Sequence, residues 1–358
     1  MPLLPHLERL AAGANLSADE AQSAMQTILD GKASPAQIAG FLMALRVHGE
    51  TVDELVGFAR AMRQTAVRVD LGLDGETVLD TCGTGGDGAG TFNISTIAAF
   101  VVAGAGVRVA KHGNRAVTGK PGCGSADLLD SFGIEIDMTA MALERAVRAI
   151  REVGIGFFFA PAVHTAMRHA APVRADLKIR TAFNLLGPLT NPAGANAQLV
   201  GAPSEREAQL LAGALAALGL PRGFVVHGSD GLDEITTTGP TLVFEIRNGD
   251  VERRTLEPAD FAVPIATAEQ LKGGDKKRNL EIANAVLNGE RGAPRDIVIA
   301  NAAAALVAAG RVETFLEGAA IAAMSIDSGG ARGKVAALAS VVGPGSRPVK
   351  APEARSAS

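Results

Sequence analysis

The sequence has few of the residues by which proteins bind nucleic acids. Tryptophan and tyrosine are absent, and the aromatic residues that remain are 13 phenylalanines among 358 residues. Proteins that bind single strands stack the bases on such rings. The formal net charge is −4 at pH 7, whereas DNA or RNA partners select a basic surface. We therefore expect no nucleic acid partner.

Cysteine is also scarce. Cys82 and Cys123 are the two copies, and they form neither a Cys-x-x-Cys pair nor a metal-ligand spacing. A single structural disulfide would be unusual in a chain of this size, so both are expected to be reduced thiols in a cytosol. His164 and His169 lie five residues apart without the HExxH spacing, which argues against a zinc site.

Long apolar runs and an export signal are missing as well. The first residues lack a basic segment followed by an apolar core, so we expect no signal peptide. Apolar runs such as residues 97–107 are too short to cross a bilayer and are predicted to be buried core. The sequence thus predicts a cytoplasmic protein with no membrane partner.

The first seventy residues carry three helix starts and no strand signal. Ser17 with Glu20 and Thr51 with Glu54 form capping-box pairs, and Ser34 precedes a proline at a first helical position. Apolar residues follow each start at helical spacing. These features predict a small helical domain whose apolar faces suit contacts between two copies.

Short β-rich runs alternate with helical stretches from about residue 77. This alternation predicts an α/β fold, with a small α-helical domain plus a large α/β domain whose mostly parallel central sheet is flanked by helices. Asn248-Gly249 predicts an added antiparallel hairpin. The predicted strands are Thr77–Asp80, Val107–Lys111, Ile155–Ala160, Ala197–Ala202 and Gly223–Gly228. The predicted domains are residues 1–70 joined by part of 165–192, residues 71–345, and a flexible tail at 346–358.

The stretch DTCGTGGDGAGTFNIST, residues 80–96, is rich in glycine and follows the first predicted strand. It leads into a helix for which Asn93 and Ser95 are cap candidates. Backbone N–H groups at a helix start, with no Cβ in the approach, bind phosphate or pyrophosphate. A dinucleotide site is less well supported, because the next strand ends in Lys111-His112 and not in the acidic residue that binds a ribose.

Two more polar loops follow predicted strands. KHGNRA, residues 111–116, brings positive charge through Lys111 and Arg115. GSDGLDEIT, residues 228–236, contains adjacent carboxylates that are suited to Mg²⁺ together with substrate phosphates. Because the carboxyl ends of parallel strands meet at one edge of a sheet, we expect both loops to share one cavity with the glycine-rich stretch.

One arginine is the remaining candidate for substrate binding. Arg174 stands in a proline-flanked segment, and its guanidinium is suited to pairing with a carboxylate. The neighbouring Arg168, Lys178 and Arg180 are expected to be mostly surface charges.

Six motifs occur together in one order: CGTGGD, FNIST, KHGNRAV, GSAD, RTAFNLLGPLTNP and GLDEI. They resemble the motifs of the anthranilate phosphoribosyltransferase family, whose members join anthranilate to phosphoribosyl pyrophosphate in tryptophan synthesis. The resemblance runs from the helical start to about Val342. It implies a homodimer joined through the helical domains, and Mg²⁺ as two ions, one of which arrives with the pyrophosphate.

The resemblance also implies the catalytic and metal-binding residues. Lys111, Asp233 and Glu234 would be catalytic, and Ser95 would join the two carboxylates in holding magnesium. A bound cation would also explain why an acidic residue, Asp87, stands in the middle of a phosphate-binding stretch, because the cation makes negative charge favourable there.

The substrate-binding residues follow from the same resemblance. Anthranilate would contact Gly83, Asn114 and Arg174. Phosphoribosyl pyrophosphate would contact Gly83, Gly86, Asp87, Thr91, Asn93, Ser95, Thr96, Lys111 and Ser125.

One loop departs from the family pattern. This chain reads KHGNRAVTGKPGCGSADLLD where the family usually reads KHGNRAVSSKSGSADVLE, so it is two residues longer between Val117 and Gly124, with Pro121 and Cys123 inserted. The contacts expected from Thr118, Gly119 and Ser125 depend on how this loop closes.

The implied reaction is an oxocarbenium-like displacement assisted by Mg²⁺. The amine of anthranilate is a neutral nucleophile, so positioning and electrostatics at the departing pyrophosphate should contribute most, and no catalytic triad is expected. A pyrimidine nucleoside phosphorylase of related fold is one alternative, although the paired acidic residues would then lack an obvious task. A non-catalytic relative that binds nucleic acid is the other, and the acidic balance disfavours it.

Overall fold

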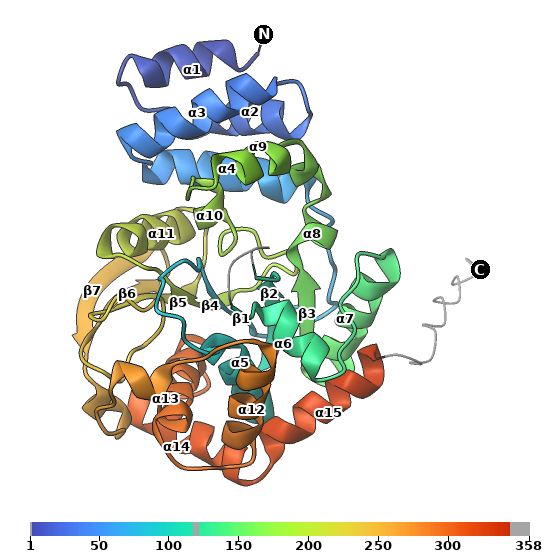
Figure 1. Cartoon of the computed structure of the whole chain (residues 1–358), viewed down its shortest axis with the longest axis vertical. Coiled ribbons are helices and arrows are strands. Elements are labelled where there is room, and N and C mark those ends of the chain that lie inside the picture. Colours follow the sequence, from blue (N-terminus) through green and yellow to red (C-terminus); the bar gives the residue numbers. More distant parts are fainter. Residues whose placement is uncertain (1, 117–121, 344–358) are drawn as a thin grey trace.

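The computed structural model describes residues 2–116 and 122–343. It consists of a helical lobe and a larger α/β part built on one sheet (Figure 1). The predicted fold class is confirmed. The expectations for Thr118, Gly119, Pro121 and the tail at 346–358 lie outside the described residues.

Four helices at the start of the chain build the lobe. Three of them begin where the sequence predicts, because Ser17, Ser34 and Thr51 each accept a hydrogen bond from the N–H three residues later. Each pair is a full capping box. The helices are α1 (Leu4–Ala11), α2 (Ala18–Leu29), α3 (Pro35–His48) and α4 (Val52–Thr65).

A later segment of the chain returns to the lobe. It contains α8 (Ala160–Val163), η1 (Thr165–His169), α9 (Ala171–Leu177) and α10 (Phe183–Leu186). Helix α9 lies beside α3, and α10 lies beside α4 (Figure 1). Val173 and Phe183 belong to the hydrophobic core that α2, α3 and α4 form. This core continues through α11 (Glu205–Ala217) to Val200 and Val225 on one face of the sheet.

The sheet has seven strands in the order β3-β2-β1-β4-β5-β6-β7. The first five in this order are parallel, and β6 and β7 are antiparallel. Strand order therefore reverses between β1 and β4, the position where α/β proteins bind ligands outside the carboxyl ends of the strands. The strands are β1 (Val78–Gly83), β2 (Arg108–Gly113), β3 (Ile155–Phe159), β4 (Ala197–Gly201), β5 (Arg222–Gly228), β6 (Thr241–Arg247) and β7 (Asp250–Leu256).

Strands β1 and β2 extend further than the sequence predicts. They were expected to end at Asp80 and Lys111, but they end at Gly83 and Gly113. The additional residues of β1 pair with β4, as far as Gly83 opposite Gly201. The neighbouring strand supplies hydrogen bonds that local sequence cannot reveal. Lys111 therefore lies inside a strand and is buried.

The predicted hairpin is confirmed. Asn248 and Gly249 join β6 to β7 with φ angles of 51° and 95°. Two successive positive φ angles are what a two-residue hairpin turn requires, and Asn-Gly is the preferred pair there.

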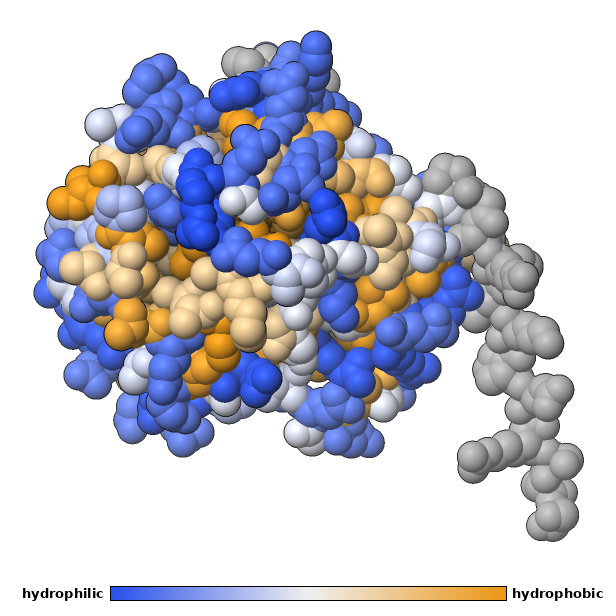
Figure 2. All heavy atoms as spheres, turned by 90° about the horizontal axis from the view of Figure 1, so that it is seen from below, coloured by the Kyte–Doolittle hydropathy of each residue, from blue (hydrophilic) through white to orange (hydrophobic). Residues whose placement is uncertain are grey.

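Helices cover both faces of the sheet. Helix α11 lies on the side of the lobe, and in β4 the alternation of side chains sends Val200 into that core and Leu199 into the opposite one. Figure 2 shows the end of the molecule opposite the lobe, where apolar patches alternate with hydrophilic residues. The remaining helices are α5 (Ile94–Gly104), α6 (Ser125–Ser131), α7 (Ala140–Glu152), α12 (Lys276–Leu287), α13 (Ala293–Ala308), α14 (Phe315–Asp327) and α15 (Gly330–Val342), with short η2 (Pro258–Phe261) and η3 (Ala268–Leu271). Within residues 2–116 and 122–343, no helix is both long and apolar enough to cross a bilayer.

Candidate active site

The glycine-rich segment between β1 and α5 forms an open turn at the edge of the sheet where strand order reverses. Gly85 and Gly86 have φ angles of 65° and 84°, which residues with a Cβ rarely adopt. Within the described chain, the N–H groups of Gly86, Asp87 and Gly88 donate to no other residue. Free N–H groups of this kind suit an anionic ligand such as phosphate.

The acidic loop after β5 meets this turn. The N–H of Gly85 donates to Oδ2 of Asp233 at 2.8 Å. A Cβ at Gly83 would lie 2.5 Å from the same oxygen, and one at Gly201 would overlap the backbone carbonyl of Asp233. Because Gly83 and Gly201 end adjacent strands, their bare backbones let the acidic loop approach. The structure therefore brings together the glycine turn and the Asp-Glu pair, as the sequence predicts.

Glu234 reaches the first turn of α5. Its Oε1 accepts a hydrogen bond from the N–H of Ser95 at 3.1 Å, and so occupies one of the N–H groups that a helix start leaves free. The carbonyl of Ser95 accepts from the hydroxyl of Thr81 at 3.0 Å, which ties the helix start to β1. Thr96, which follows Ser95 in the first turn of α5, is buried, with 1% of its surface exposed.

Burial and like charge raise the pKa of both carboxyl groups in the acidic loop. The pKa of Asp233 rises to about 7, first through burial and then through the carboxylate of Asp87. The pKa of Glu234 rises to about 8, first through burial and then through Asp233. Neighbouring carboxylates that raise the pKa of Asp233 and of Glu234 make this loop favourable for a bound cation.

The donor set of this site fits magnesium. The carboxylates of Asp233 and Glu234 and the hydroxyl of Ser95 offer oxygen donors, and Mg²⁺ is usually held by one or two carboxylates plus substrate phosphates. Among the described residues, no three His, Cys, Asp or Glu side chains gather into a metal-binding group. Where Mg²⁺ is held by so few protein groups, phosphate oxygens and water complete its coordination.

Lys111 lies beneath the acidic pair and is 3% exposed. Its ammonium donates to the carbonyl of Thr81 and interacts with the charges of Asp80 and Glu234. Burial lowers the pKa of Lys111, while Asp80 acts in the opposite direction. The structure therefore gives Lys111 a role in compensating buried carboxylates from inside β2, and not from the strand end that the sequence indicated.

Asn93 directly precedes α5, as predicted, but its side chain does not cap the helix. Its Nδ2 donates to the carbonyl of Cys123 at 2.7 Å, and its Oδ1 accepts from Asn279 at 3.0 Å. Thr91 forms an isolated antiparallel bridge with Lys272. These contacts hold the glycine turn against the segment that leads into α12, and no pattern in the sequence indicated that this segment lies here.

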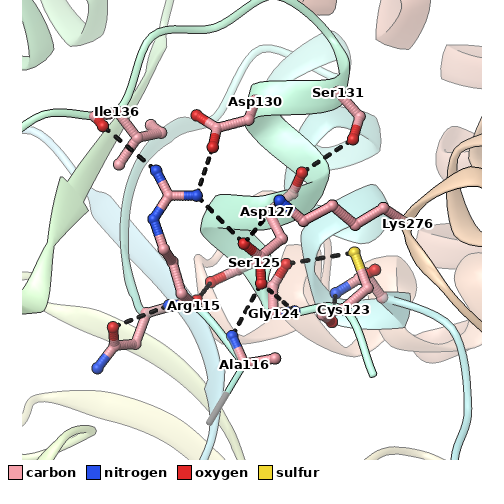
Figure 3. Close-up of polar contacts among 12 residues, drawn as sticks. Arg115, Ala116, Cys123, Gly124, Ser125, Asp127, Asp130, Ser131, Ile136 and Lys276 are labelled. Carbon is pink, nitrogen blue, oxygen red and sulfur yellow. Dashed lines mark hydrogen bonds and ion pairs between the residues drawn. The ribbon is translucent and has the colours of Figure 1, made fainter. Parts of the chain in front are cut away.

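Polar contacts around Asp127 fix the loop that follows β2 (Figure 3). Oδ2 of Asp127 accepts from the N–H groups of Ala116 at 2.9 Å and Gly124 at 3.0 Å. Its Oδ1 pairs with Arg115 at 3.1 Å and with Lys276 at 3.2 Å. One carboxylate thus joins the two described ends of the lengthened loop.

Arg115 is not available as a free cation. Its guanidinium also pairs with Asp130, one turn after Asp127 on α6. The expectation that Arg115 offers positive charge to a substrate is wrong, because two carboxylates neutralise it. Asn114 and Ser125 do meet, since the hydroxyl of Ser125 donates to the carbonyl of Asn114 at 3.2 Å.

The arginine that touches the glycine turn is Arg180 and not Arg174. The guanidinium of Arg174 stacks on the ring of Phe183, 5.2 Å from its centroid, and burial lowers the pKa of Arg174. No hydrogen bond within the described residues links the Arg174 side chain to the turn. Arg180, expected to be mostly a surface charge, donates to the hydroxyl of Thr84 at 3.3 Å and to the carbonyl of Gly85.

Two buried histidines, His112 in β2 and His164 after α8, contact each other. The ring centroids of His112 and His164 are 5.2 Å apart. Nδ1 of His112 is 3.3 Å from the carbonyl of Gly187, and Nε2 of His164 is 3.4 Å from the hydroxyl of Thr190. Burial lowers the pKa of His112 to about 3 and that of His164 to about 4. Both rings are therefore neutral in the folded protein at neutral pH.

These histidines should make the folded state less stable in mild acid. Below about pH 6.5 the unfolded chain binds protons at both rings and the folded chain does not, so the free energy of unfolding falls as pH falls. By about pH 5 the loss amounts to about 2 kcal/mol for each ring. Urea unfolding of the wild type and of the His112→Gln/His164→Gln variant, followed by circular dichroism across this range, measures the effect.

The difference in stability between the wild type and the double variant reports on the two imidazoles alone, because Asp233 and Glu234 titrate in both proteins. The raised pKa values of those carboxyls act in the opposite direction and cancel in the difference. Parallel stability profiles for the wild type and the double variant would contradict the prediction.

Comparisons with known proteins decide the family. Residues 4–66 match the helical bundle domain of a glycosyl transferase family, and residues 75–332 match its a/b domain. An anthranilate phosphoribosyltransferase of Solibacter usitatus is 71% identical over 339 residues, which are 95% of this chain and 98% of that protein. The chain belongs to the anthranilate phosphoribosyltransferase family.

Solved structures of this family have the same fold. The anthranilate phosphoribosyltransferase of Thermus thermophilus superposes with a TM-score of 0.87 at 41% identity, over 96% of this chain and 99% of that one. The Saccharomyces cerevisiae enzyme in complex with phosphoribosyl pyrophosphate and Mg has a TM-score of 0.85 at 28% identity, over 95% and 97%. A second structure of the yeast enzyme, in complex with 4-fluoroanthranilate, has a TM-score of 0.83. The expected family, fold class and enzymatic nature are thus confirmed.

Proposed function

We propose that this chain transfers the phosphoribosyl group of phosphoribosyl pyrophosphate to the amine of anthranilate and releases pyrophosphate. The observation that carries the proposal is the hydrogen bond from Gly85 to Asp233, which joins an anion-binding turn to an acidic pair suited to a cation. The names of the relatives and the ligands of the yeast structures support the same pair of substrates.

We assign the substrate contacts to the residues that the sequence predicted for them. Anthranilate is assigned to Gly83, Asn114 and Arg174, and Arg174 offers a guanidinium to the carboxylate of anthranilate. The free N–H groups of the turn support its assignment to the pyrophosphate. Phosphoribosyl pyrophosphate is assigned to Gly83, Gly86, Asp87, Thr91, Asn93, Ser95, Thr96, Lys111 and Ser125.

The chemistry that we propose is a displacement with oxocarbenium character at the ribose carbon. The anthranilate amine is neutral and needs no base to activate it, so the chain's residues act mainly on the leaving group. Ser95, Asp233 and Glu234 would hold magnesium, in two ions of which one arrives with the substrate. When bound, this metal neutralises charge on the departing pyrophosphate. Lys111 favours the ionised form of Glu234, since its ammonium lowers the pKa of that carboxyl.

The assembly and location of the protein are part of the proposal. Residues 1–70 with part of 165–192 would form one domain and residues 71–345 the other. Two copies would join through the helical lobe, on which Leu4 and Val47 are exposed at 41% and 82%. The reduced cysteines support a cytoplasmic location, because both Cys82 and Cys123 are free in the structure.

A fluorescence assay tests the proposed reaction. Anthranilate emission should decay when enzyme, phosphoribosyl pyrophosphate and Mg²⁺ are all present and should persist when any one is omitted. The protein contains neither tryptophan nor tyrosine, so its own emission contributes little background. Persistent emission with all components, together with phosphorolysis of a pyrimidine nucleoside, would overturn the proposal in favour of the nucleoside phosphorylase alternative.

A further inference from the structure

The side chain of Arg180 crosses from the lobe to the glycine turn. Arg180 lies between α9 and α10, where the N–H of Thr181 donates to Oδ1 of Asn184 at 3.0 Å and fixes the backbone at the start of α10. Its side chain is 25% exposed. An arginine that served only for solubility would extend into solvent, so the direction of this side chain needs another explanation.

Two segments hold the Arg180 guanidinium. Nη2 donates to Oε2 of Glu207 at 2.9 Å, and the carboxylate of Glu207 is only 15% exposed. Glu207 is itself fixed in the first turn of α11, because its N–H donates to the hydroxyl of Ser204 at 3.2 Å. The same Nη2 donates to Thr84, and Nη1 donates to the carbonyl of Gly85. Arg180 thus ties α11 to the glycine turn.

The contact with Gly85 fixes a peptide plane of the turn. A trans peptide is rigid, and its C=O and N–H point in opposite directions. Holding the carbonyl of Gly85 toward Arg180 therefore directs the N–H of Gly86 away from Arg180. That N–H donates to no other group in the described chain. It is one of the free N–H groups that suit the pyrophosphate.

Gly85 is held from both sides, because its N–H donates to Asp233 while its carbonyl accepts from Arg180. Glycine at position 86 suits this arrangement, since its φ angle is 84° and a Cβ there would overlap Nη1 of Arg180 as it lies in the structure. A left-handed glycine segment has many accessible conformations when unrestrained. The two hydrogen bonds on opposite sides of Gly85 reduce this conformational freedom.

We propose that Arg180 is a positioning residue, held by Glu207, that sets the glycine turn in the conformation that binds pyrophosphate. The inference rests on the proposed function for the identity of the substrate. It concerns a residue that is part of neither the anthranilate nor the metal assignment. The group positioned is the backbone of Gly85 and Gly86, and the ligand class is a diphosphate.

Steady-state kinetics of Arg180→Gln test the proposal. The KM for phosphoribosyl pyrophosphate should rise about tenfold, because a charge-assisted restraint on its binding turn is lost. The KM for anthranilate should stay within about twofold. Lys178→Gln removes an exposed cation two residues away and is the matched control, expected to behave as the wild type. Arg180→Lys keeps the charge but loses the two-pronged guanidinium, so its KM for phosphoribosyl pyrophosphate should be intermediate.

Inorganic pyrophosphate with Mg²⁺ provides a probe that does not depend on the transfer reaction. Its Kd, measured by titration calorimetry, should rise in Arg180→Gln by about the same factor as the KM. Glu207→Gln should weaken binding in the same direction, and the double variant should be no weaker than Arg180→Gln alone. An unchanged Kd, or equal changes in both KM values, would overturn the assignment. Loss of anthranilate turnover in the wild type with normal pyrophosphate binding would instead count against the proposed function.

Discussion

Glu234→Gln is expected to reduce kcat by about 10²-fold or more. The substitution keeps the size of the side chain and its acceptor oxygen for the N–H of Ser95, and removes the negative charge that would hold the leaving-group metal. Charge stabilisation at the departing group is commonly the largest single contribution to such reactions. Steady-state rates at saturating substrates, measured over a range of Mg²⁺ concentrations, quantify the loss.

A control variant separates this effect from a general loss of acidic charge. Glu252 lies on the exposed edge strand β7, so Glu252→Gln should leave kcat within about twofold of the wild type. If Glu234→Gln reached the wild-type kcat once Mg²⁺ was saturating, Glu234 would have no part in the chemical step.

Gly201→Ala is expected to lower the free energy of unfolding by about 3 kcal/mol or more and to abolish most of the activity. The added methyl group would overlap the backbone carbonyl of Asp233. Backbone atoms at the end of β4 cannot give way as a flexible side chain can. The acidic loop would have to move away from the glycine turn. Urea unfolding followed by circular dichroism, together with the fluorescence assay, measures both effects.

Gly187→Ala is the matched control for this variant. Gly187 has a helical φ of −51° and nothing within 4 Å of an added Cβ, so the same substitution should change stability by no more than about 0.5 kcal/mol. Retention of wild-type stability and activity by Gly201→Ala would show that the acidic loop can be displaced without cost.

The fold was largely predictable because its signals are local. Capping boxes at Ser17 and Thr51 set helix starts, and the Asn248-Gly249 pair set the hairpin. The predicted ends of β1 and β2 were wrong. In β1, residues 81–83 gain their strand conformation from pairing with β4. That pairing joins residues more than a hundred positions apart, and no local pattern reports it.

The site was predictable in its chemistry but not in its connections. The sequence indicated that the glycine turn and Asp233 meet at one edge of the sheet. It did not indicate that Asp127 neutralises Arg115, that Asn279 reaches Asn93, or that Arg180 grips the turn. Each of these pairs a side chain with a group whose position only the tertiary fold decides. The sequence cannot distinguish a cationic side chain that pairs with a carboxylate in the folded structure from one that is solvated.

The core that runs from the lobe through α11 to the sheet affects how the protein comes apart. Val200 and Val225 on the sheet and Phe58 on α4 belong to one apolar interior. We therefore expect the lobe and the sheet to unfold together, and heating should give one calorimetric transition for both. A fragment that began after α4 would expose this interior to water and self-associate. Substitutions at the buried positions of α4 and α11 should therefore destabilise the lobe and the sheet together.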